Sequence, residues 1–122
     1  MATWDDVVEI AMRYPEVEET TSWQTPSLKV KGRFFARLRT EAEGGLAIVC
    51  DPSEKAALLA SADPTYYTTK HYDGYAMILV DLARIELPRL AELIEDAWLL
   101  KAPIRVHKAH EASRNDSPGA DG

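Results

Sequence analysis

The sequence predicts an α+β domain built as a two-layer sandwich, with an antiparallel sheet of about five strands and helices on one face. Apolar residues recur at helical spacing near both ends of the chain, and short alternating or fully apolar runs lie between them. Few residues separate most of these runs, and such short turns join antiparallel neighbours. The chain has 122 residues and 46% hydrophobic composition, which is enough for one core.

Three helices are expected from their capping signals and apolar faces. The first covers residues 4–13, because Thr3 is a suitable N-cap and Asp6 stands at the third helical position. The second covers residues 52–61, where proline occupies the first helical position and a carboxylate the third. The third covers residues 88–101, where apolar side chains line one face and charged side chains the other.

Short runs rich in apolar, aromatic or β-branched residues are the strand candidates. They cover residues 17–23, 27–31, 34–39, 46–50, 65–69 and 76–82. The break at Gly32 predicts that the second and third runs form a β-hairpin. The run over 46–50 is apolar on both faces, as expected of a central strand.

The domain is expected to end near residue 105. Residues 106–122 contain almost nothing to bury, so this segment is predicted to be a disordered tail. His107 and His110 are spaced for one helical turn, but without further ligands they are interpreted as solvated. The single Cys50 lies in an apolar run and is expected to be a buried, inert thiol.

The composition predicts a cytoplasmic protein without a membrane segment. No apolar run reaches the length of a membrane helix, and the first residues lack the order of a secretory signal. The net charge of −6 argues against a protein that coats nucleic acid indiscriminately.

Charge is nevertheless segregated along the chain. Residues 1–28 contain six acids and one base, whereas residues 29–39 contain five bases and no acid. These bases are Lys29, Lys31, Arg33, Arg37 and Arg39. All five stand at odd positions, and apolar residues occupy most of the even ones, which suggests one cationic face and one core-directed face.

The hairpin register decides whether that segregation survives folding. A two-residue turn at Lys31 and Gly32 would pair Val30 with Arg33 and scatter the cations over both faces. A three-residue loop or a bulge would keep the cations together. We favour the three-residue loop, which pairs Val30 with Phe34 and leaves Phe35 exposed among the cations.

The first functional hypothesis is nucleic-acid binding, because cations neutralise phosphates and an exposed aromatic ring can stack on bases. The second is a protein-interaction or small-ligand module on the open sheet face, framed by aromatic residues. Those residues are Trp23, Phe35, Tyr72 and Tyr75. A third interpretation assigns the cations only to solubility and protection of a strand edge.

No catalytic, metal or cofactor site is expected, so the protein is predicted not to be an enzyme. His71 stands near a turn at Asp73 and Gly74, where a hydrogen-bonded ring is the usual role, and a general base or metal ligand is the alternative. Cys50 in a buried strand is a poor nucleophile beside it. The acids near the N-terminus are interpreted as a solvated face, with a weak cation site as the alternative.

Several motifs, taken in order, resemble the MmcQ/YjbR family over roughly residues 3–105. They are Tyr14-Pro15-Glu16-Val17-Glu18-Glu19, Trp23-Gln24-Thr25-Pro26-Ser27-Leu28-Lys29-Val30, Phe34-Phe35-Ala36-Arg37-Leu38, His71-Tyr72-Asp73-Gly74-Tyr75, Leu93-Ile94-Glu95-Asp96-Ala97-Trp98 and Ala102-Pro103. Met77 departs from the pattern, since a Trp is expected there.

The resemblance implies a fold like that of CyaY, the bacterial frataxin, and DNA binding through a double-wing arrangement. DNA is thus the expected partner of a monomer or weak homodimer. Iron binding, as in frataxins, is a distant alternative, because fold alone does not transfer function. The candidate nucleic-acid-binding residues are Lys29, Lys31, Arg33, Phe35, Arg37, Arg39, Lys70, His71 and Tyr72.

Overall fold

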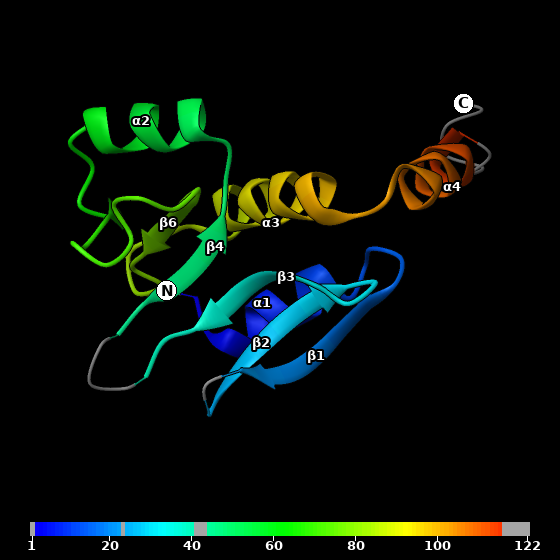
Figure 1. Cartoon of the computed structure of the whole chain (residues 1–122), viewed down its shortest axis with the longest axis horizontal. Coiled ribbons are helices and arrows are strands. Elements are labelled where there is room, and N and C mark those ends of the chain that lie inside the picture. The colour runs from blue at the N-terminus through cyan, green and yellow to red at the C-terminus, as the bar shows by residue number, and fades with distance from the viewer. Residues whose placement is uncertain (1, 23, 41–43, 116–122) are drawn as a thin grey trace.

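The computed structural model describes residues 2–22, 24–40 and 44–115. Within these residues four helices and six strands follow one another along the chain (Figure 1). They are α1 (Trp4–Ala11), β1 (Val17–Ser22), β2 (Thr25–Val30), β3 (Arg33–Leu38), β4 (Leu46–Val49), α2 (Pro52–Ala60), β5 (Tyr66–Tyr67), β6 (Met77–Val80), α3 (Leu87–Lys101) and α4 (Ile104–Asn115).

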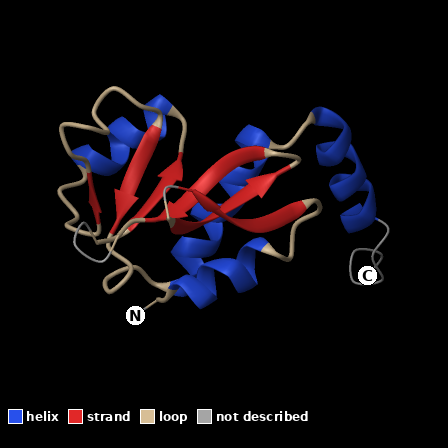
Figure 2. Ribbon diagram, turned by 60° about the horizontal axis from the view of Figure 1, so that its bottom comes forward, coloured by secondary structure: helices blue, strands red, loops and turns tan. Residues whose placement is uncertain are grey.

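The six strands form one sheet in the order β1-β2-β3-β4-β6-β5, and every neighbouring pair is antiparallel (Figure 2). The predicted α+β class and antiparallel sheet are therefore confirmed. Strand β4 lies in the interior of the sheet, as its apolar run predicts, and β1 and β5 are the edges. The sheet has six strands where about five were expected, and β5, which lies in the predicted run 65–69, has only two residues and pairs with β6.

The main core lies between one face of the sheet and the helices. Helix α1 contributes Val7, α2 contributes Leu58, and α3 contributes Ile94 and Trp98. Trp98 is completely buried, and its Nε1 donates a hydrogen bond to the carbonyl oxygen of Pro15 at 3.1 Å. Burial of this apolar surface is the principal stabilising contribution in such a sandwich.

Local capping chemistry sets the starts of the first two helices. The Thr3 hydroxyl accepts from the Asp6 amide, and the Asp6 carboxylate accepts from the Thr3 amide at 2.9 Å, which completes a capping box. The Asp51 carboxylate likewise accepts from the Ser53 amide at 2.8 Å, directly before Pro52.

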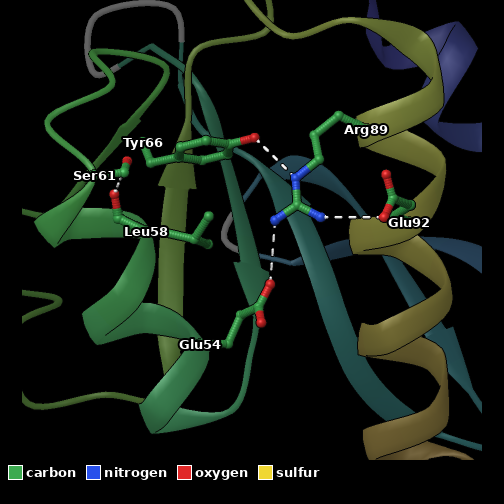
Figure 3. Close-up of polar contacts among 6 residues, drawn as sticks. All are labelled: Glu54, Leu58, Ser61, Tyr66, Arg89 and Glu92. Carbon is green, nitrogen blue, oxygen red and sulfur yellow. Dashed lines mark hydrogen bonds and ion pairs between the residues drawn. The ribbon is translucent and has the colours of Figure 1, made fainter.

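Arg89 of α3 links three elements at the β5 edge of the sheet (Figure 3). Its guanidinium donates to the Tyr66 hydroxyl of β5 and to the Glu54 carboxylate of α2, both at 3.2 Å. It also forms an ion pair at 3.5 Å with Glu92, one turn further along α3. This contact fixes the short edge strand between two helices.

The expected disordered tail is wrong for residues 106–115, because α4 covers them. The physical reason is a ring contact that periodicity does not reveal. The centres of the His107 and His110 rings lie 5.5 and 5.1 Å from the centre of the Trp98 ring. Neither histidine is therefore simply solvated, contrary to the prediction. Val106 is buried in the same core. The prediction for 116–122 lies outside the described residues.

Across the described ranges, no helix has both the length and the apolar character needed to cross a bilayer.

Candidate functional site

The β2–β3 hairpin closes with a two-residue turn. Lys31 and Gly32 have φ values of 50° and 77°, and Val30 pairs with Arg33. Two positive φ values in succession are typical of a turn whose twist matches that of the flanking strands. The favoured three-residue loop is therefore wrong, because Lys31 adopts the left-handed conformation instead of lengthening the loop.

A β-bulge follows the turn and changes which side chains face outward. Lys29 pairs with Phe34 and Leu28 pairs with Ala36, so Phe35 has no opposite residue in this pair of strands. Phe35 and Ala36 both lie in the main core and are completely inaccessible. The expected exposure of Phe35 is wrong, since the bulge turns its ring inward and leaves Phe34 on the opposite face.

We call the sheet side opposite α1 and α3 the second face; it carries Lys29, Phe34, Arg37, Ala47 and Leu79. Two of the predicted cations, Lys31 and Arg33, do not lie on this face. Lys31 forms an exposed ion pair with Glu16 at 3.6 Å. Arg33 donates to the carbonyl oxygen of Lys101 in α3 at 3.3 Å. The five cations of the hairpin are thus divided between different surroundings.

Arg37 is held on the second face by two directional hydrogen bonds. Its Nε donates to Thr25 Oγ1 and its Nη1 donates to the Tyr72 hydroxyl, both at 3.0 Å. The Arg39 guanidinium carbon lies 5.6 Å from the centre of the Tyr72 ring, within cation–π range. Tyr72 is buried against Ala47 and Leu79, so its ring joins the loop after β5 to the sheet.

A hollow of about 680 Å³ opens on the second face beside Arg37. We call it the aromatic hollow; its lining residues are Phe34, Arg37, Thr40, His71, Tyr72, Tyr75 and Met77. The His71 ring lies 5.0 Å from the Tyr72 ring and 5.7 Å from the Tyr75 ring. Tyr75 is 55% exposed, so much of its ring is open to solvent. The hollow therefore combines accessible aromatic surface with a guanidinium group.

Lys55 of α2 holds the loop that carries three of these rings. Its buried ammonium donates to the carbonyl oxygens of Tyr72 and Tyr75, both at 2.7 Å, and to that of Asp73 at 3.4 Å. A buried charge requires such partners, and here they are three backbone acceptors of one loop. Lys55 is consequently a positioning residue for the aromatic hollow.

The remaining predicted site residues occupy different positions. Lys70 is exposed and immediately precedes His71, whose exposed ring lines the hollow. Trp23, expected to frame the open face, lies outside the described residues. Burial raises the pKa of Cys50 to about 11, which keeps the thiol protonated near neutrality. Across residues 2–22, 24–40 and 44–115, no group of three or more metal-ligating side chains is assembled.

Phe34, Thr25 and Lys55 were not among the predicted site residues. The sequence gives no clear signal for Phe34, because regular alternation places Phe34 and Phe35 on opposite faces without showing which of the two is buried. Lys55 lies one helical turn before buried Leu58, which indicates an inward-facing ammonium. Thr25 gives no comparable signal, since its role depends on where Arg37 lies across the sheet.

A six-stranded antiparallel sheet, with helices on one face and a hollow on the other, defines the class of this small α+β protein. The family described as YjbR matches residues 12–100, and the chain belongs to the YjbR family. Uncharacterised proteins of Mycobacterium bovis and Mycobacterium tuberculosis are each 36% identical to it over 127 aligned positions. Each alignment covers 93% of this chain and 98% of the relative.

Proposed function

We propose that this protein binds nucleic acid, DNA in the first instance, through the second face. The observation that carries the proposal is the placement of Arg37, which lines the aromatic hollow and donates to the Tyr72 hydroxyl. Arg39 is buried and lies over the Tyr72 ring. Lys29 extends the same face toward the hairpin turn. Ammonium and guanidinium groups contact phosphate oxygens, and neighbouring rings provide stacking surfaces.

The cations on this face set the expected strength of binding. Lys31 and Arg33 point elsewhere, and Glu18 stands opposite Lys29 on β1. With a net charge of −6, long-range attraction to a polyanion is weak. Arg39 is buried, with 9% of its surface exposed, so the contacts counted here are those of Lys29 and Arg37. We therefore expect modest affinity that falls with salt, with a log–log slope of about −1 to −2 for roughly two phosphate contacts.

Fluorescence anisotropy of labelled DNA and RNA oligonucleotides, titrated at several salt concentrations, tests this proposal. Lys29→Gln is expected to weaken binding and to reduce the salt slope by about one. Lys31→Gln is the matched control, because this residue also lies on the hairpin but pairs with Glu16 at the turn.

Two results would count against the proposal. The absence of salt-dependent binding to any oligonucleotide at low salt would exclude nucleic acid as the ligand. Equal losses for Lys29→Gln and Lys31→Gln would show that the second face is not the contact surface.

A further inference from the structure

We infer that the aromatic hollow accepts one unpaired nucleobase, so that the protein prefers single strands to duplexes. This inference rests on the proposed function and assigns a part of the nucleic acid to a part of the site. Cations alone would bind any phosphate backbone, paired or unpaired. The hollow adds a surface that only an accessible base can use.

The rings of the hollow are arranged for contact with a planar group. Tyr72 is buried and forms part of the floor, whereas His71 and Tyr75 are exposed and Phe34 is half-buried. The Tyr72 and Tyr75 rings are inclined at 67° with centres 6.4 Å apart, so they present surfaces in different directions. A flat ring entering the hollow can stack on one of them and meet the edge of another.

The charge beside the hollow favours a nucleotide over an uncharged aromatic ligand. Arg37 lines the hollow and donates to the Tyr72 hydroxyl. The Arg39 guanidinium lies over the ring of the same tyrosine. A nucleotide carries its phosphate one sugar away from its base, so both groups can be contacted at neighbouring points. In a duplex the base faces are covered by stacking, and the hollow then has nothing to receive.

The hollow is formed before any ligand arrives. Lys55 holds three loop carbonyls, and Arg37 holds the Tyr72 hydroxyl, so the rings from the loop and from β3 already lie together. Ordering a loop on binding costs conformational entropy, and a loop that is already ordered avoids most of that cost. This arrangement explains how a few side chains can supply measurable selectivity for bases.

Three fluorescein-labelled ligands of equal length test the inference: an oligothymidylate, its duplex with oligoadenylate, and a strand with abasic sugars at every position but the same phosphates. The wild-type chain is expected to bind the oligothymidylate about 10-fold or more tighter than the abasic strand, given the binding free energy that stacking of one base usually contributes. The duplex is expected to bind less tightly than the oligothymidylate, although its phosphates are more densely spaced.

Tyr75→Ala is expected to remove most of the difference between the oligothymidylate and the abasic strand. The side chain is 55% exposed, so the variant should fold. Leu87→Ala, which removes a 47% exposed apolar side chain at the start of α3, is the matched control and should keep the difference.

Equal binding of the abasic strand and the oligothymidylate by the wild-type chain would overturn the inference and leave the proposed function standing. A difference that persists in Tyr75→Ala and in Phe34→Ala would also overturn it, because the base would then lie elsewhere. Failure to bind all three ligands would overturn the proposed function itself.

Discussion

The two faces of the sheet are stabilised in different ways. On the helix side, side chains such as Leu28, Ile48 and Trp98 are completely buried in one continuous apolar core. On the second face, a small cluster of Ala47, Tyr72 and Leu79 is supplemented by directional hydrogen bonds from charged groups. Apolar burial is non-directional, whereas hydrogen bonds fix orientation. The first face therefore supplies most of the stability, and the second supplies a defined surface geometry.

The largest expected effect comes from the helix side. Trp98→Ala should lower the free energy of unfolding by about 3–5 kcal/mol, because it empties a fully buried site. It should also release α4, whose two histidine rings contact this indole. Urea denaturation followed by circular dichroism measures both effects. A loss below about 1.5 kcal/mol would show that the core can close around the cavity.

Lys55→Met tests the second face with a smaller expected effect. The substitution leaves three loop carbonyls without their donor and should cost about 1–3 kcal/mol. Hydrogen exchange should accelerate for the amides of Tyr72, Asp73 and Tyr75, which bond within the same loop. Exposed Lys70→Met is the control. Unchanged exchange in Lys55→Met would show that the loop is held by its own turn.

Tyr72→Phe removes only the hydroxyl that accepts from Arg37. A loss of about 1 kcal/mol is expected, because the ring still fills its place against Ala47 and Leu79. Tyr75→Phe, at a 55% exposed position, should change stability by less than about 0.5 kcal/mol. Chemical denaturation of both variants makes the comparison. Equal effects would mean that the Arg37 contact adds nothing to stability.

Asp96→Asn should have the smallest effect on the free energy of unfolding, and it should stabilise the protein where the other substitutions destabilise it. Partial burial and the neighbouring carboxylates of Glu54 and Glu95 raise the pKa of Asp96. A carboxyl whose pKa is raised by folding destabilises the fold once it ionises, so the substitution should stabilise the protein near neutrality. Because Asp96 is exposed, we expect only a few tenths of a kcal/mol.

The pH dependence distinguishes this cause from others. The advantage of Asp96→Asn should shrink as the pH falls through the raised pKa, since both folded forms are then neutral at this site. Thermal denaturation at neutral and acidic pH measures the difference. Asp73→Asn, in the loop after β5, is the control, and an advantage that does not change with pH would exclude the electrostatic explanation.

Local chemistry made the helix starts predictable from sequence. Thr3 and Asp6, and Asp51 followed by Pro52, satisfy backbone groups within a few residues of themselves, so no tertiary information is needed. The central position of β4 also followed from its composition. Helix α4 did not, because its packing depends on Trp98, which belongs to a different helix.

The candidate site was only partly predictable. Lys29 and Arg37 lie on one face, as predicted, but a bulge places them there and the favoured three-residue loop does not form. The family assignment is confirmed over residues 12–100. Lys55 and Thr25 act through partners distant in sequence, so their roles emerge only once the sheet and the loop are placed.

The bulge at Phe35 has a consequence for comparing relatives of this protein. One extra residue reverses the assignment of inward and outward positions for everything that follows it in β3. A relative that lacks this residue, or carries the insertion two positions later, would present different side chains to solvent despite a similar string of letters. Alignments of this segment should therefore be anchored on strand pairing, and cations should be counted as equivalent only when they share a cross-strand neighbour.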